Sequence, residues 1–137
     1  PISVVFMDVD YFKSYNDEYG HVEGDAALRA VAEALSTVVR ESDVLARYGG
    51  EEFVALLPTA NVHVAEAIAE RCRQQVAGIT SLKCGLSLSA GVATLMPCDW
   101  DGDAVAVTDA EVLLSAADQA LYVAKGAGRN CIRTALL

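Results

Sequence analysis

The spacing of apolar residues predicts alternating strands and helices along the first third of the chain. A continuous apolar run from Ile2 to Met7 indicates a strand that is covered on both faces. The polar stretch 11–20 is typical of a short helix that stops at Gly20, with Asp10 as the expected N-cap. Apolar residues then recur every three or four positions, which predicts an amphipathic helix over 25–39.

The remaining pattern completes a fold of mixed helices and strands. Two apolar runs flank Gly49 and Gly50, so 46–57 predicts a hairpin whose two-residue turn permits positive φ. Later segments read as a helix from about Val64 to Val76, a strand over 86–95 interrupted by Gly91, a loop over 96–108, a helix over 110–125 and a short edge strand from Cys131. This order predicts an α/β (α+β) fold in which helices flank a mixed sheet of about five strands, because a tight hairpin forces one antiparallel pair.

Composition narrows the class of partner. A chain of 137 residues with 53% hydrophobic residues is long enough for one domain with its own core. The formal net charge of −9 disfavours a nucleic-acid partner, whose backbone attracts Lys and Arg. Four cysteines without a CxxC pair, and only two histidines, argue against a zinc site and favour reduced thiols.

No segment of the sequence indicates a membrane span or a signal peptide, because no apolar run approaches the roughly 20 residues that a bilayer requires. We therefore expect a cytoplasmic domain without membrane contact of its own. The chain begins at Pro1 and has no initiator Met, so we expect a fragment of a longer protein. A membrane anchor elsewhere in that parent protein is left open.

Carboxylates stand where predicted strands end or begin. Asp8 ends the first strand, a common place for ligand chemistry in α/β sheets, although an Asp there is more often a helix cap. Glu51 and Glu52 leave the hairpin turn side by side, and taken alone they are typical of solvated turn charges. If the first strand and the hairpin are neighbours, Asp8 and Glu51 converge, and their oxygens suit Mg²⁺. A metal ion would also explain why the repulsion is tolerated.

Groups suited to anions lie near these carboxylates. Three backbone N–H groups open the helix after the first strand, those of Tyr11, Phe12 and Lys13. Gly49 and Gly50 let a phosphate or sugar approach the backbone without meeting a Cβ. Lys125 and Arg129 are four residues apart and can clamp a terminal phosphate. The simpler alternative is that these two cations complement a helix C-terminus.

In this order, the residues resemble the GGDEF family, the catalytic domain of diguanylate cyclases. The family signature stands here as the variant GGEEF, at 49–53. The stretch MDVDYFKSYNDEYGHVEGD (7–25) is similar to the family pattern DxDxFKxxNDxxGHxxGD, and ADQALYVAKGAGRN (117–130) to ADxALYxAKxxGRN. The resemblance implies a single GGDEF domain over 1–137 with a fold like that of nucleotidyl cyclases and polymerase palms. The family's usual N-terminal helix, with its DxLTGLxNR stretch, is missing.

The resemblance implies a role for each matching position. Asp8, the Val9 carbonyl and Glu51 would hold two Mg²⁺ or Mn²⁺ ions, and Glu52 would support that metal site and the deprotonation of the attacking hydroxyl. The phosphates would be bound by Phe12, Lys13, Lys125 and Arg129, beside Gly49 and Gly50. Asn16 and Asp25 would read guanine. A carboxylate at Asp25 accepts from the N1–H and N2–H₂ edge, which adenine lacks, so selectivity for GTP over ATP follows.

The implied reaction joins two GTP molecules into cyclic di-GMP and releases two pyrophosphates. One domain binds one GTP, so a homodimer with the two domains antiparallel is expected, and a two-metal site suits the transfer. A rival reading is a catalytically silent GGDEF module that binds GTP or cyclic di-GMP and signals by contact. Asp8, Glu51 and Glu52 are all present, which favours the enzyme.

Arg40 and Asp43 fit a second family feature, the RxxD site at which the product inhibits the enzyme. Five residues separate them from Gly49, as in the family, and Arg71 is a candidate for a further contact with product. The ordinary alternative is an Arg near a helix end and an Asp in a turn, both of which are favourable there.

Overall fold

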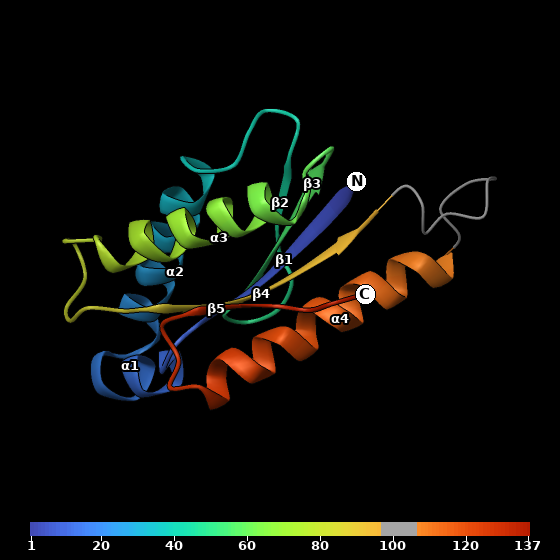
Figure 1. Ribbon diagram of the computed structural model, residues 1–137. Coiled ribbons are helices and arrows are strands. Elements are labelled where there is room, and N and C mark those ends of the chain that lie inside the picture. Colours follow the sequence, from blue (N-terminus) through green and yellow to red (C-terminus); the bar gives the residue numbers. More distant parts are fainter. Residues whose placement is uncertain (97–106) are drawn as a thin grey trace.

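The computed structural model describes residues 1–96 and 107–137, and its elements follow the predicted order (Figure 1). Their bounds are β1 (Ile2–Val9), α1 (Phe12–Tyr19), α2 (His21–Ser36), β2 (Val44–Arg47), β3 (Glu52–Pro58), α3 (Val62–Ala77), β4 (Leu88–Leu95), α4 (Val107–Gly126) and β5 (Ile132–Thr134). None of the described helices is long and apolar enough to cross a membrane.

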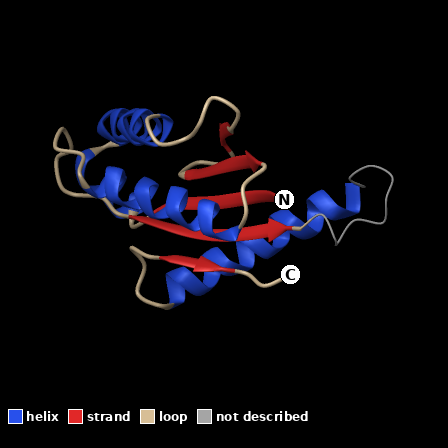
Figure 2. Cartoon of the chain, turned by 45° about the horizontal axis from the view of Figure 1, so that its top comes forward, coloured by secondary structure: helices blue, strands red, loops and turns tan. Residues whose placement is uncertain are grey.

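One five-stranded mixed sheet forms the centre of the molecule, with strand order β2-β3-β1-β4-β5 (Figure 2). The strand β1 pairs antiparallel with β3 and β4, β2 pairs antiparallel with β3, and β5 pairs parallel with β4. The predicted fold class and the edge position of the last strand are therefore confirmed. Both chain termini lie at one end of the sheet, and α1 lies at the other (Figure 1).

The strand β1 is buried on both faces because helices cover both sides of the sheet, which explains its continuous apolar run. Val5, Met7 and Val9 belong to the core cluster that also contains residues of α2 and α3. Val4 and Phe6 belong to the cluster that contains residues of α4. Since side chains alternate along a strand, the next even-numbered residue, Asp8, also belongs on the α4 side.

Gly91 does not interrupt β4, as the sequence had suggested, but lies within it. A Cβ at this position would overlap the carbonyl oxygen of Ala117 and the amide nitrogen of Leu121. The absence of a side chain therefore lets α4 lie directly against the sheet. This close packing brings the C-terminal end of α4 to the end of β1.

Other local expectations were also wrong. Asp10 does not cap α1, since the N-cap is Tyr11, at φ 55°, and no side chain caps the helix. The hairpin loop spans 48–51, and neither Gly49 nor Gly50 has a positive φ. The helix predicted over 25–39 begins earlier, at His21. The loop predicted over 96–108 lies mostly outside the described residues.

Candidate active site

The acidic end of β1 is tied to the end of α4. Asp8 is only 6% exposed, and Lys125 Nζ donates to its Oδ2 at 2.8 Å. The two residues are 117 positions apart in sequence, so the pair depends on the packing of α4 at Gly91. Asp8 is not a helix cap, because no side chain caps α1.

The hairpin brings two more carboxylates to this place. Glu52 is the register partner of Asp8 on the neighbouring strand, and the Val9 N–H donates to the Glu51 carbonyl at 3.1 Å. Both glutamates are half-buried. Their side chains form no hydrogen bond or ion pair with any residue that the structure describes. The condition on which Asp8 and Glu51 were expected to converge, that the first strand and the hairpin are neighbours, is met.

A cavity of about 250 Å³ opens at this end of the sheet. Its lining includes most of the residues predicted for metal and phosphate binding, namely Asp8, Val9, Phe12, Lys13, Glu51, Lys125 and Arg129. Glu52, Gly49 and Gly50 are not among its lining residues, although they lie within two positions of Glu51 in the chain. Oxygen ligands and cationic side chains thus share one small space.

The basic side of this cavity combines backbone and side-chain donors. Because no side chain caps α1, the first N–H groups of this helix have no partner within it and can receive an anion. The Arg129 guanidinium lies over the Tyr11 ring, 5.0 Å from its centroid. Lys13 is exposed and lines the same cavity. This side is therefore suited to phosphate.

The donor set fits a hard divalent cation that is shared with a substrate. Asp8 and Glu51 provide carboxylates and Val9 a carbonyl, and among the described residues Lys125 is the one cation that forms an ion pair with these carboxylates. Within 1–96 and 107–137, no three acidic, histidine or cysteine side chains form a ready metal cage, and the described cysteines are free. Mg²⁺ commonly takes one or two carboxylates and completes its shell with water and phosphate oxygens.

The hairpin loop is held by its own strand. Arg47 Nε donates to the Gly49 carbonyl at 3.1 Å, and Arg47 Nη2 donates to the Gly50 carbonyl at 2.7 Å. A Cβ on Gly49 would lie 2.7 Å from Glu52 Oε2, whereas a Cβ on Gly50 would meet nothing within 4 Å. The open space at Gly50 agrees with the expectation that a ligand can approach the backbone there.

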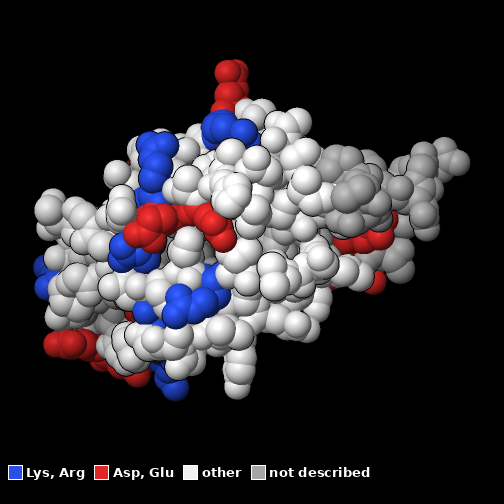
Figure 3. Space-filling view, in the orientation of Figure 1, with Lys and Arg blue, Asp and Glu red and all other residues white. Residues whose placement is uncertain are grey.

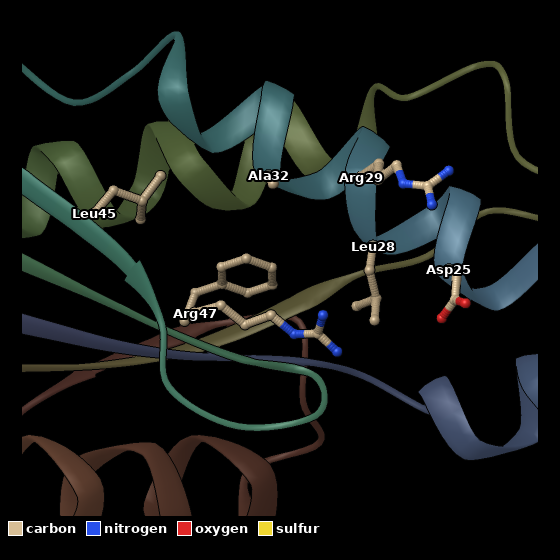
Figure 4. A pocket seen from close by; sticks show the side chains of 7 residues that line it. Asp25, Leu28, Arg29, Ala32, Leu45 and Arg47 are labelled. Atoms are coloured by element: carbon tan, nitrogen blue, oxygen red, sulfur yellow. The ribbon is translucent and has the colours of Figure 1, made fainter.

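A second cavity, of about 410 Å³, lies between α2 and the strands β2 and β3 (Figure 4). Its walls include the apolar side chains of Leu28, Leu45 and Phe53, and Asp25 lies among its lining residues. In Figure 4, Arg47 extends from β2 toward Leu28. The lining thus combines apolar side chains, one carboxylate and the cations Arg29 and Arg47, and the carboxylate can accept from a planar base that presents N–H donors.

Asn16, the other predicted base-reading residue, does not line this second cavity. Its Oδ1 is buried without a hydrogen-bond partner among the described residues, and it packs against Gly24, where a Cβ would overlap the amide. An unpaired buried oxygen costs about 1–3 kcal/mol. A donor from a ligand would remove that cost.

The predicted product-site residues Arg40 and Asp43 bind each other. Arg40 Nη2 donates to Asp43 Oδ1 at 2.7 Å and to the Pro58 carbonyl at 2.9 Å, and the Asp43 side chain is fully buried. Burial alone would raise the pKa of Asp43, but the hydrogen bonds and charge of Arg40 outweigh it and lower that pKa.

Arg71, the third predicted product contact, is exposed on α3. No hydrogen bond or ion pair in the described part of the chain links it to Arg40 or Asp43. On the face that Figure 3 shows, side chains of both signs lie close together over α3, where Arg73 pairs with Glu70. Among the described residues, the structure therefore brings Arg40 and Asp43 into contact but not Arg71.

Sequence reasoning missed a network around Asp10, which is 3% exposed. Its carboxylate accepts from Ser87 Oγ and Ser89 Oγ, each at 2.6 Å, and from the Asn130 N–H at 3.0 Å. A signal was present, because Asp8 and Asp10 are two apart, as are Ser87 and Ser89, and the strand period puts such pairs on one face.

Comparison with protein families and curated sequences gives one consistent result. The family model described as "Diguanylate cyclase, GGDEF domain" matches residues 1–131. The chain is 43% identical over 136 residues to diguanylate cyclase DosC of Escherichia coli K12, and 37% identical over 144 residues to the response regulator PleD of Caulobacter vibrioides. These matches cover 95% and 96% of this chain but only 27% and 29% of those relatives.

Solved structures agree with the family match. The active GGEEF domain of a diguanylate cyclase from Vibrio cholerae is 33% identical, with a TM-score of 0.86 over 99% of this chain and 83% of that one. The GGDEF domain of DgcB from Caulobacter crescentus, solved in complex with c-di-GMP, is 30% identical, with a TM-score of 0.83 over 97% of this chain and 77% of that one. The predicted palm-like cyclase fold is confirmed.

Proposed function

The chain belongs to the GGDEF family of diguanylate cyclase domains, and we propose that it condenses two GTP molecules into cyclic di-GMP with release of two pyrophosphates. The observation that carries this proposal is the cavity in which Asp8 and Glu51 lie with Lys125 and Arg129. A triphosphate with its divalent ions needs both kinds of group.

Asp8, the Val9 carbonyl and Glu51 would hold the divalent ions, either Mg²⁺ or Mn²⁺, in two positions. When bound, these ions would neutralise phosphate charge and lower the pKa of an attacking hydroxyl. Glu52, opposite Asp8 in the sheet, would keep this region negative and assist in removing the hydroxyl proton. The unpaired glutamate side chains support these roles.

The chain's own donors would hold the phosphates. The N–H groups of Phe12 and Lys13, with the Lys13 ammonium, would bind the β- and γ-phosphates at the start of α1. Lys125 and Arg129 would bind the γ-phosphate, with Arg129 as a fork and Lys125 as a point charge. Lys125 would then serve Asp8 and the phosphate together, because an ammonium has three donors.

The base would lie toward the second cavity, where Asp25 would accept from the N1–H and N2–H₂ edge of guanine. Asn16 would contribute through its unpaired Oδ1. With ATP in the site, the Asp25 and Asn16 oxygens would face N1 of adenine, which is itself an acceptor. We therefore propose that the site prefers GTP to ATP.

Two copies of the chain would face each other antiparallel, because each cavity holds one triphosphate and each 3′-hydroxyl must reach the α-phosphate of the other nucleotide. Cyclic di-GMP would also act as an inhibitor at Arg40 and Asp43, with Arg71 as a further contact. The solved DgcB domain with bound c-di-GMP supports product binding within the family.

The test is to incubate the chain with GTP and Mg²⁺ over a series of protein concentrations and to separate the products by chromatography. We expect cyclic di-GMP and pyrophosphate, at a rate per chain that rises with protein concentration because the active species is a dimer. ATP under the same conditions serves as the matched control. GTP binding without any cyclic di-GMP, even at the highest protein concentration, would favour the silent-module reading instead.

A further inference from the structure

Asp10 joins three segments that are far apart in sequence. It follows β1, it accepts from two serines at the start of β4, and it accepts from the backbone of Asn130 in the turn between α4 and β5. The Asp10 N–H also donates to the Ser87 carbonyl at 2.9 Å. A buried residue with this many contacts fixes the positions of all three segments relative to each other.

The bonding of Asp10 differs from that of a metal ligand. Both of its carboxylate oxygens already accept hydrogen bonds, and every donor is neutral. Asp8, by contrast, is paired with a cation and lies beside two glutamates whose side chains pair with none of the described residues. The Asp10 carboxylate is therefore satisfied by hydrogen bonds within the protein.

The turn that Asp10 holds has an unfavourable backbone conformation. Arg129 and Asn130 both have positive φ, 64° and 47°, a conformation that is uncommon for arginine and that asparagine adopts more readily. The Arg129 N–H donates to the Ala124 carbonyl at 3.1 Å, and Arg73 Nη1 donates to Asn130 Oδ1 at 3.0 Å. Surrounding contacts must maintain this turn, and the bond from the Asn130 N–H ends on a buried carboxylate, that of Asp10.

The turn determines where the Arg129 side chain lies. Its guanidinium rests over the ring of Tyr11, which precedes α1, at the cavity that Lys125 and Asp8 also line. Tyr11 directly follows Asp10 in the chain, and Asn130, whose N–H binds Asp10, directly follows Arg129. Asp10 is therefore linked to both partners of this cation–π contact. An arginine held in place before binding loses less side-chain entropy when it meets its ligand.

We propose that Asp10 is a positioning residue: by binding the Asn130 amide it holds Arg129 against Tyr11 and prepares the site for a terminal phosphate. This inference rests on the proposed function, in which Arg129 meets the γ-phosphate of GTP. It assigns Asp10 a role through Arg129 and none in metal binding.

The experiment compares the binding of 3′-deoxy-GTP and 3′-deoxy-GDP, in the presence of Mg²⁺, by calorimetry. Neither nucleotide has the hydroxyl needed for condensation, and they differ only in the γ-phosphate. For Asp10→Ala we expect triphosphate affinity to fall by about 10- to 100-fold, as is common when a supporting hydrogen bond is lost, with little change for the diphosphate. With GTP as substrate, KM should rise more than kcat falls.

Asp10→Asn is the matched rescue variant. Its amide oxygen can accept from the Asn130 N–H, and its NH₂ group can donate to the Ser89 hydroxyl, which accepts as well as donates. We expect it to recover most of the preference for triphosphate that Asp10→Ala loses. If Asp10→Ala fails to fold, the double variant Ser87→Ala with Ser89→Ala removes two of the three donors and should lower the same preference.

Each result separates this inference from the proposed function. A wild-type chain that binds the triphosphate more tightly, with variants that keep that preference unchanged, would overturn the role of Asp10 and leave the proposed function intact. A wild-type chain with equal affinity for both nucleotides would overturn the role of Arg129 and this inference together. Failure of the wild type to bind either nucleotide would overturn the proposed function itself.

Discussion

Two charged regions of this molecule use their carboxylates in opposite ways. Between α2 and β2, Arg40 and Asp43 satisfy each other, and Arg40 also binds the Pro58 carbonyl. At the end of β1, Asp8 faces Glu52 across the sheet and Glu51 lies beside them, with Lys125 as the cation that pairs with Asp8. The first arrangement stabilises the fold, whereas the second leaves charge beside a cavity.

This contrast has an energetic reason. Like charges directly opposite each other on neighbouring strands destabilise a sheet, and here Lys125 pairs with Asp8 while the Glu52 side chain has no cationic partner among the described residues. In the pair of Arg40 and Asp43 only the Asp43 side chain is buried, so removing Arg40 is costly because it leaves that buried carboxylate uncompensated. Mutations at the cavity should therefore affect activity more than stability, and mutations at the pair should do the reverse.

The largest effect is expected for Glu51→Gln, which removes metal-binding charge at nearly constant shape. Cyclic di-GMP formation, measured by chromatography, should fall by at least about 100-fold, the size of effect seen when one transition-state contact is lost. The unfolding midpoint should stay the same or rise slightly, since repulsion is relieved. Glu41→Gln, at an exposed glutamate next to Arg40, is the matched control. Retained turnover would remove Glu51 from the site.

Asp25→Ala should have the next largest effect. The Asp25 carboxylate is exposed and has no hydrogen-bond or ion-pair partner among the described residues, so it belongs with the charges left for a ligand. We expect the ratio of kcat/KM for GTP to that for ATP to fall by about 10- to 100-fold, the worth of a good two-point contact to a base. Asp17→Ala, on α1, serves as control. An unchanged ratio would mean that guanine is read elsewhere.

Arg40→Ala tests the other side of the contrast. The buried Asp43 would lose its partner, so the free energy of unfolding in urea should drop by about 1–3 kcal/mol. If the RxxD site is the product site, inhibition by cyclic di-GMP should also be relieved while the initial rate is largely retained. Arg71→Ala should leave stability unchanged, because Arg71 is exposed and forms no hydrogen bond or ion pair with the described residues. Inhibition that persists in Arg40→Ala would point to product bound in the active site.

The smallest expected effect is a pH dependence of stability from Asp43. Its pKa is lowered in the folded state from an ordinary value of 3.8, so its contribution is present above that value and is lost as the pH falls through the lower folded pKa. Thermal unfolding of the wild type and of Asp43→Asn should therefore differ at neutral pH and converge in acid. A difference that stays constant down to the lowest accessible pH would contradict this assignment.

Much of the fold could be predicted because its signals are local. The order of strands and helices follows from apolar spacing, and the adjacency of Asp8 and Glu51 follows from the ends of two predicted strands. Turn conformations were harder to predict. The sequence suggested a two-residue turn at Gly49 and Gly50 that permits positive φ, but neither glycine has one. The loop spans 48–51 and is held by Arg47, a contact that no local pattern indicates.

The misreading of Asp10 has a similar cause. Its position before a helix is typical of a cap, and only the serines at the start of β4 and the distant amide of Asn130 reveal its actual bonding. The N–H groups of a helix start compete with tertiary donors for the same carboxylate, and here three tertiary donors bind it. Gly91 likewise reads as a break in a strand until α4 is seen to lie directly against it.

The sequence by itself determined the family, the fold class and the chemical character of the site, because motifs, apolar periods and residue types are properties of the chain. Only the tertiary structure decided which charges are free and which are paired. Lys125 meets Asp8, Arg129 meets Tyr11 and Asp10 meets Asn130 across separations of about 120 residues in sequence. Such contacts depend on how α4 packs against the sheet, and packing is decided by all of the core at once.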